Sequence, residues 1–419
     1  MNDLLRFATA GSVDDGKSTL IGRLLHDTKA LFDDTLEAVA HTSARRGYDG
    51  LDLALFTDGL RAEREQGITI DVAYRYFATP RRTFIIADTP GHARYTRNMV
   101  TGASTADLAV ILLDARAGLV EQTRRHAVIA ATLGIPRVVL AVNKMDLVDW
   151  SEARFDELAE EFACFVDPLG FRSATPIPLS ALEGDNVVEP TPRSSWYAGP
   201  PLLRFLEEVP AERDDPVAVG ARLPVQWVIR PQPGSGDERR RYAGTLVSGR
   251  LRPGDEVVVL PSGDRTTVRS LDAADEPLPE ADAGAAVTVQ LADELDVGRG
   301  DLIAHAADAP AVTRQLEATV CWFSEQPLRP RARLLLQHTT RTTKAIAAEL
   351  VDRLDVVTLN REPAPPELAM NDLGTVRLTL AGPVAADAYA TNRASGSFVL
   401  VDEATNDTVG AGLVLSTTP

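Results

Sequence analysis

Lysine is nearly absent from this 419-residue chain, since only four of its 43 basic residues are lysines. Cysteine is rarer still, and because Cys164 and Cys321 lie far apart, they indicate neither a disulfide framework nor a metal site. No apolar run approaches the ~20 residues of a membrane-spanning helix, and the N-terminal segment lacks the basic start of a signal peptide. These absences predict a cytoplasmic protein that makes no membrane contact.

Positive charge is also in short supply. Sixty acidic residues against 43 basic ones give a formal net charge of -17. An acidic surface repels phosphate backbones, so nucleic-acid binding is not expected. The hydrophobic content of 44% and charged content of 25% are ordinary for a globular protein, and a chain of this length predicts roughly three domains.

The first half of the chain alternates short apolar runs with helical stretches. The apolar runs are continuous rather than alternating, which is typical of strands buried on both faces of a parallel sheet. Alternation with helices predicts a doubly wound α/β domain. The expected strands are Leu5–Ala10, Thr83–Ala87, Leu108–Ala115 and Val138–Val142, and the expected helices start at Lys17, span Gln122–Leu133 and end the domain at 202–209.

The second half of the chain has a different pattern of residues. Beyond residue 214, short β-branched runs are separated by Gly, Pro and Asp, which favours antiparallel barrels or sandwiches. A second series of such runs begins near residue 315. The chain is therefore predicted to consist of an α/β P-loop domain over residues 1–211 and two antiparallel β-barrel domains over residues 212–309 and 310–419.

A phosphate-binding motif opens the first predicted helix. The spacing G-x-x-x-x-G-K-[S/T] follows a predicted strand, which is the context that a P-loop requires. Its glycines allow backbone N–H groups to surround phosphates at the positive end of the helix. Lysine then reaches the β and γ oxygens and the serine hydroxyl binds Mg²⁺. The motif comprises Gly11, Ser12, Val13, Asp14, Asp15, Gly16, Lys17 and Ser18, with Thr19 following.

A second motif, Asp88-Thr-Pro-Gly91, ends the predicted strand TFIIAD. Ligands of doubly wound sheets lie at such strand ends. Asp88 is predicted to hold Mg²⁺, directly or through water, and the Gly91 N–H to sense the γ-phosphate. The spacing D-x-x-G is weak alone and gains force from its position downstream of the P-loop.

The third motif, Asn143-Lys144-Met-Asp146, follows the apolar run VVLAV. A carboxylate at Asp146 accepts hydrogen bonds from the N1 and 2-amino groups of guanine, for which adenine has no counterpart. Asn143 is expected to brace the loop and Lys144 to lie along the base. The tripeptide Ser180, Ala181 and Leu182 is a weaker fifth element, whose backbone N–H would meet the guanine carbonyl.

Two further residues are assigned catalytic roles from their positions. Thr69, at the end of a long polar segment, is expected to bind Mg²⁺ only when a γ-phosphate is present. His92 directly follows the second motif and is expected to orient the attacking water. The other five histidines are read as ordinary structural or surface residues.

Together these motifs resemble those of the translation-factor superfamily of GTPases. Their amino-acid sequence most resembles that of the GTPase subunit of bacterial ATP sulfurylase. The stretches TDGLRAEREQGITIDVAYRYF, IIADTPGHARYTRNMVTGASTADLAVILLDAR and YATNRASGSFVLVD carry that resemblance. It implies a heterodimer in which a small partner transfers the adenylyl group of ATP to sulfate while this chain binds GTP and Mg²⁺. It also implies that Val13 and Ile68 form an apolar gate in front of His92.

Two alternatives remain open from the sequence. A translational GTPase that carries aminoacyl-tRNA would share the fold. The negative net charge and the amino-acid sequence of the P-loop argue against it. An assembly GTPase without metabolic output would also carry these motifs.

Overall fold

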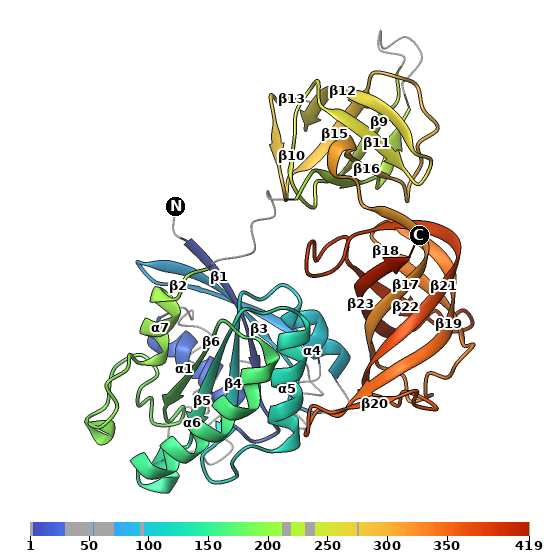
Figure 1. The fold of residues 1–419 in the computed structure, drawn as a ribbon. Helices are drawn as coiled ribbons and strands as arrows, with labels where there is room; N and C mark the ends of the chain where they lie inside the picture. The colour runs from blue at the N-terminus through green and yellow to red at the C-terminus, as the bar shows by residue number, and fades with distance from the viewer. Residues whose placement is uncertain are drawn as a thin grey trace. The chain divides into compact units, whose positions relative to one another are not determined.

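The structure is a computed structural model that describes residues 3–29, 53, 71–92, 96–211, 219–230, 239–274 and 276–418. The chain forms two compact units (Figure 1), one built mainly from residues 1–212 and the other mainly from residues 213–419. Each unit has its own hydrophobic cores.

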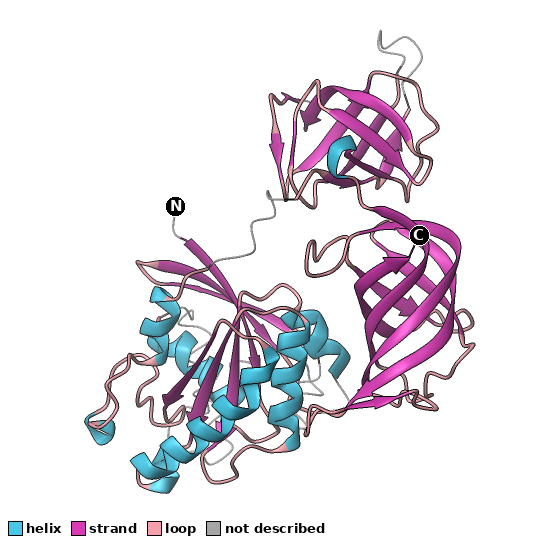
Figure 2. Cartoon of the chain, viewed as in Figure 1, coloured by secondary structure: helices cyan, strands magenta, loops and turns pink. Residues whose placement is uncertain are grey.

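A six-stranded sheet organises the first unit (Figure 2). Its order is β2-β3-β1-β4-β5-β6, in which only the edge strand β2 runs antiparallel to its neighbour. Strand β4 is buried along its whole length, as expected for a central parallel strand. The strands are β1 (Asp3–Ala10), β2 (Ala73–Ala78), β3 (Arg82–Asp88), β4 (Leu108–Asp114), β5 (Arg137–Asn143) and β6 (Ser173–Pro178).

Helices cover both faces of this sheet. Figure 1 shows α4, α5 and α6 in front of the sheet and α1 behind it. Helices α1 and α7 share one core with Leu5, Phe7 and Phe84. The helices are α1 (Lys17–Asp27), α4 (Thr96–Ala103), α5 (Glu121–Thr132), α6 (Glu152–Val166) and α7 (Leu202–Glu208), with short 3-10 turns η3 (Met145–Val148), η4 (Asp167–Leu169) and η5 (Pro192–Ser194).

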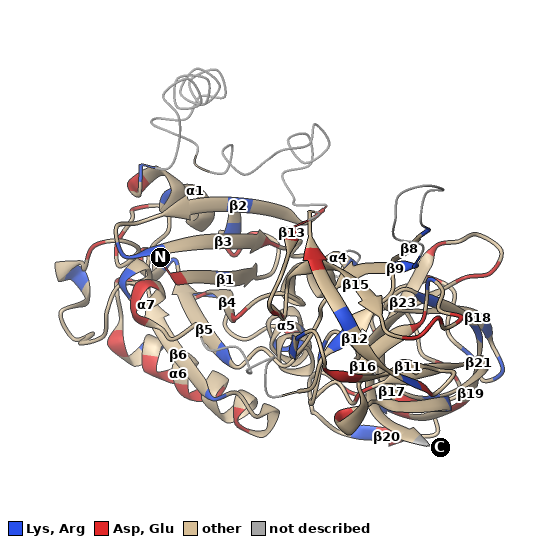
Figure 3. Cartoon of the chain, turned by 90° about the horizontal axis from the view of Figure 1, so that it is seen from above, with Lys and Arg blue, Asp and Glu red and all other residues tan. Residues whose placement is uncertain are grey.

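Local chemistry explains how α6 begins and which face it exposes. Ser151 caps the helix, since its hydroxyl accepts a hydrogen bond from the Arg154 N–H at 3.3 Å. Phe155, Leu158 and Phe162 recur at helical spacing and are buried. The acidic positions of α6, which are red in Figure 3, are exposed.

The first sheet of the second unit runs in the order β7-β16-β11-β12-β15-β9-β8, with β13 attached to β12 and a separate β10–β14 pair. All of its ladders are antiparallel, and they surround one apolar core. The strands are β7 (Arg222–Pro224), β8 (Trp227–Ile229), β9 (Arg241–Thr245), β10 (Arg250–Leu251), β11 (Glu256–Leu260), β12 (Asp264–Ala273), β13 (Glu276–Pro277), β14 (Ala281–Asp282), β15 (Ala286–Leu291) and β16 (Leu302–His305), and η6 (Ala306–Asp308) follows.

The last sheet closes on itself. Its order is β18-β22-β23-β17-β21-β19, and the additional β18–β19 pairing joins the two ends into a six-stranded barrel that carries β20 on β19. Closure leaves no free strand edge within the ring. The strands are β17 (Ala311–Trp322), β18 (Arg333–His338), β19 (Arg341–Leu354), β20 (Arg361–Pro363), β21 (Leu373–Ala386), β22 (Ser397–Val401) and β23 (Thr408–Thr418).

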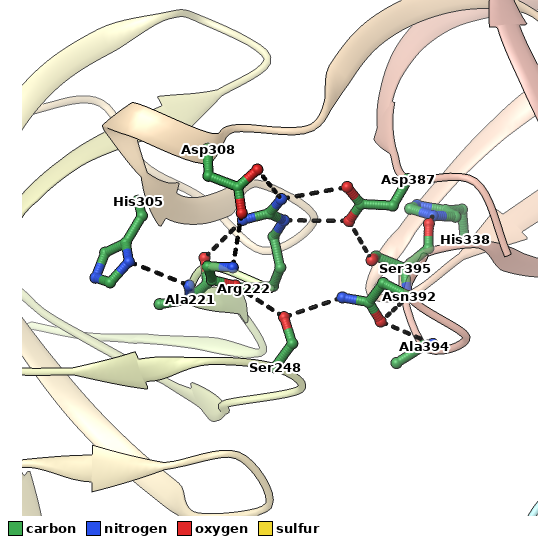
Figure 4. Close-up of polar contacts among 11 residues, drawn as sticks. Ala221, Arg222, Ser248, His305, Asp308, His338, Asp387, Asn392, Ala394 and Ser395 are labelled. Carbon is green, nitrogen blue, oxygen red and sulfur yellow. Dashed lines mark hydrogen bonds and ion pairs between the residues drawn. The ribbon is translucent and has the colours of Figure 1, made fainter. Parts of the chain in front are cut away.

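A buried polar network joins the two β-rich parts of the second unit (Figure 4). Arg222 is 1% exposed and binds Asp387 through both nitrogens of its fork, with Nε–Oδ2 at 3.1 Å and Nη2–Oδ1 at 3.2 Å. The Ser395 hydroxyl donates to the same carboxylate at 2.5 Å. Nearby, the Asn392 amide donates to the Ser248 hydroxyl at 2.9 Å. A buried pair with two parallel hydrogen bonds restrains the relative orientation of the two side chains and also stabilises their contact.

The predicted fold class is confirmed. The expected strands and helices of the first half appear within a few residues of their predicted bounds, and antiparallel sheets follow, one of them a closed barrel. The domain boundaries at residues 211 and 309 stay predictions. None of the helices in the described residues is long and apolar enough to cross a membrane.

Candidate nucleotide site

The P-loop lies between β1 and α1, and its last glycine is required by both conformation and packing. Gly16 has φ +90°, and a Cβ there would lie 2.4 Å from the Asn143 Nδ2. Among the described residues, no side chain caps α1, and no acidic residue lies in its first turn. The start of a helix is a favourable place for an anion, because the first-turn N–H groups point toward it.

A buried carboxylate shapes the loop from inside. The Ser12 N–H donates to Asp15 Oδ2 at 2.6 Å, and the Asp15 N–H donates back to the Ser12 carbonyl at 3.3 Å. Burial raises the pKa of Asp15 to about 6, although the hydrogen bond from Ser12 opposes that rise. Val13 and Asp14, in contrast, are exposed.

The first two motifs meet at an ion pair. Lys17 Nζ lies 3.5 Å from Asp88 Oδ1, and the two side chains are 7% and 1% exposed. The parallel pairing of β1 with β3 sets Asp88 beside Thr9, immediately before the P-loop. Gly91 is in close contact with the loop as well, because a Cβ there would lie 2.4 Å from the Gly11 carbonyl oxygen.

The third motif is bonded directly to the P-loop. At the end of β5, the Asn143 Nδ2 donates to the Asp15 carbonyl at 2.7 Å, while its Oδ1 accepts the Ala181 N–H at 2.9 Å. Lys144 Nζ donates to the Asp14 carbonyl. One asparagine thus connects the phosphate loop with the segment at residues 180–182.

Sequence reasoning missed an acidic residue that belongs to this group. Asp114, at the end of β4, lies 3.0 Å from Lys144 Nζ and also binds Arg116. Burial acts to raise the pKa of Asp114, but the hydrogen bonds from Arg116 and Lys144 outweigh it and hold that pKa well below its usual range. Its place at a strand end, on the edge that also carries Asp88 and Asn143, was the available signal.

The remaining predicted residues differ in how they lie. Ser18 and Thr19 are half-buried in the first turn of α1, and Asp146 is half-buried in η3. Ser180 is buried, whereas Leu182 is 59% exposed. His92 is exposed. Thr69 and Ile68 lie outside the described residues.

These residues fit the phosphates of a bound nucleotide. An uncapped helix start, two glycines that a Cβ would crowd, and a buried lysine offer the donors and the close backbone approach that phosphates need. In the part of the chain that the structure describes, no group of three or more His, Cys, Asp or Glu residues is arranged so that it could hold a metal ion. Mg²⁺ needs none, because it is commonly held by one or two protein oxygens together with substrate phosphates.

Comparison with known proteins gives consistent results. The model of the elongation factor Tu GTP binding domain matches residues 2–214, and that of the GTP-eEF1A C-terminal domain-like family matches residues 315–415. Sulfate adenylyltransferase subunit 1 of Methylorubrum populi is 52% identical over 98% of this chain and 87% of its own length. The corresponding subunit of Sulfurovum sp. is 48% identical over 99% of this chain and 87% of its own. The bifunctional enzyme CysN/CysC of Mycobacterium tuberculosis is 54% identical over 99% of this chain and 68% of its own.

Proposed function

The chain belongs to the sulfate adenylyltransferase subunit 1 family, and from this premise we propose that it hydrolyses GTP to drive formation of adenosine 5′-phosphosulfate and pyrophosphate by a partner subunit. The partner transfers the adenylyl group of ATP to sulfate. That reaction is unfavourable by itself, so the free energy of GTP hydrolysis pulls it forward.

One observation carries this proposal: the three nucleotide motifs are joined by hydrogen bonds and an ion pair. Asn143 bonds to the phosphate loop on one side and to Ala181 on the other. Lys17 and Asp88 face one another within the core. A phosphate site and a base site at a fixed separation are what recognition of one whole nucleotide requires.

Each side chain then has a specific task. The P-loop N–H groups and Lys17 bind the β- and γ-phosphates, and Ser18, Asp88 and Thr69 hold Mg²⁺, which neutralises phosphate charge when bound. His92 orients water. Its side chain is exposed in this structure.

Guanine recognition falls to Asp146, whose carboxylate accepts from N1 and the 2-amino group. Asn143 and Lys144 hold the loop that carries it, since both are bonded to carbonyls of the P-loop. Asp114 also pairs with Lys144, with Oδ2 lying 3.0 Å from Nζ.

A division of labour between two subunits is supported by the sequence, which contains a single G-x-x-x-x-G-K-[S/T] motif and no pyrophosphatase-type SGGxDS loop. Adenylyl transfer is therefore assigned to the partner. The two form a heterodimer or a higher assembly in the cytoplasm.

The test is co-expression with a neighbouring reading frame that carries an SGGxDS-type loop, followed by pyrophosphate release from ATP and sulfate with and without GTP. GTP should increase the yield of pyrophosphate. The Lys17→Ala substitution should abolish this increase and leave the rate of the partner without GTP unchanged. A yield that is independent of GTP in the wild-type complex would defeat the energetic coupling. Capture of aminoacyl-tRNA by the GTP form would instead favour a translational GTPase.

A further inference from the structure

An arginine that no motif contains holds the loop at residues 180–182 onto the phosphate-binding helix. Arg23 lies in α1 beyond the phosphate lysine, and its side chain is 20% exposed. Its Nε donates to the Ala181 carbonyl at 3.2 Å, and its Nη2 donates to the Leu182 carbonyl. Two consecutive carbonyls of one loop are thus bound by one planar fork.

The surroundings keep that fork in place. Asp27, one helical turn further along α1, lies 3.6 Å from Arg23 Nη1. Gly184 has φ +86°, and a Cβ there would lie 3.5 Å from the Cδ and Nε of Arg23. The loop turns back sharply at this point, since the Gly184 N–H donates to the Ser180 carbonyl at 2.8 Å.

The contacts also distinguish between the N–H groups of the loop. The Ala181 N–H already donates to Asn143 Oδ1, and the Glu183 N–H donates to the Ser180 hydroxyl at 3.3 Å. Within the described residues, the Leu182 N–H donates to no acceptor. This N–H belongs to the same peptide group as the Ala181 carbonyl, and in a trans peptide the two point in opposite directions.

We propose that Arg23 is a positioning residue for guanine recognition, which binds the Ala181 carbonyl so that the opposite end of that peptide, the Leu182 N–H, donates to the 6-oxo group of the base. The inference rests on the proposed function, because it concerns the same GTP site. It assigns the donor to Leu182 rather than to Ala181, and it adds α1 to the elements that determine base selectivity.

The test compares three nucleotides on the full-length protein. GDP has both the 6-oxo and the 2-amino group, IDP lacks the 2-amino group, and 2-aminopurine riboside diphosphate lacks the 6-oxo group. Loss of one oriented hydrogen bond of about 1.4 kcal/mol corresponds to a tenfold loss of affinity. Arg23→Ala should therefore weaken GDP and IDP by about tenfold while weakening the 2-aminopurine nucleotide by less than about threefold.

Two variants control the experiment. Arg23→Lys retains one donor and should recover part of the 6-oxo selectivity. Arg204→Ala removes a comparable arginine, which also pairs with an acid one turn along its helix, in α7 of the same unit, and should leave all three affinities unchanged. Unfolding midpoints of the variants establish that each is folded.

The outcomes separate the two proposals. A wild-type protein that binds none of the three nucleotides overturns the proposed function. A wild-type protein that prefers GDP, combined with an Arg23→Ala variant that weakens all three nucleotides equally or not at all, overturns the role of Arg23 alone.

Discussion

Replacing Arg222 by methionine should destabilise the β-rich unit strongly. Arg222 is 1% exposed and Asp387 9%, so water screens their attraction little. Removal of the cation leaves the Asp387 carboxylate buried beside the Ser395 hydroxyl without its charge partner. Breaking such a buried pair by removing one member costs about 3–5 kcal/mol. That cost is a large share of the 5–15 kcal/mol by which domains are typically stable.

The magnitude is measured by urea unfolding of the full chain, with hydrogen exchange resolved by peptide to assign the loss to residues 219–418. The double variant Arg222→Met/Asp387→Leu should recover most of the lost stability, because an apolar pair of similar volume leaves no buried charge. Arg250→Met is the matched control: Arg250 binds Asp282 with the same two-nitrogen geometry at the surface, and its loss should leave the unfolding midpoint nearly unchanged. A loss below about 1 kcal/mol for Arg222→Met would refute the reasoning.

Three other substitutions test the G domain. Asp146→Asn should exchange guanine for xanthine preference, because the acceptor becomes an amide, and competition of GTP against XTP for a fluorescent nucleotide measures it; retained GTP selectivity would place the base pocket elsewhere. His92→Ala should lower the GTP hydrolysis rate by about 10²–10⁴-fold with GTP affinity unchanged, and an unaltered rate in single-turnover assays would remove its role. Burial lowers the pKa of His126 to about 3, with smaller effects from the charges of Lys17 and Arg125. Below pH ~6.5 the unfolded chain therefore binds a proton at this histidine that the folded chain does not bind. The free energy of unfolding should fall by up to about 1.4 kcal/mol per pH unit as the pH is lowered from ~6.5 to ~3. His126→Gln should show a shallower decline in urea unfolding across that range, and equal slopes would contradict the assignment.

The strands of the G domain could be predicted because burial on both faces leaves a direct trace in the sequence. Leu108–Leu113 is one continuous apolar run, and the structure buries all of β4, which contains it. The edge strand β2 leaves no such trace, since its exposed Tyr74 and Tyr76 alternate with half-buried residues. Strand β2 runs antiparallel to β3, with which it pairs, and the hydrophobic periodicity of a sequence does not indicate the direction of strand pairing.

In the candidate site, only those residues could be predicted that belong to a motif with a fixed spacing of particular residue types. Spacing identifies Gly16, Lys17 and Asn143, but not that Asn143 bonds to the P-loop and to Ala181 at once. Asp114 and Arg23 belong to no motif, because each acts through contacts with residues distant in sequence. The Arg222–Asp387 pair spans 165 positions and is equally invisible to local patterns.

The most direct measurement is equilibrium binding of labelled GTP to the purified chain in the presence of magnesium, alongside the Lys17→Ala variant. The account predicts saturable binding that excess GTP or GDP displaces and excess ATP does not, and that Lys17→Ala greatly weakens. A wild-type protein that fails to retain GTP, or that exchanges it for ATP, would contradict the account.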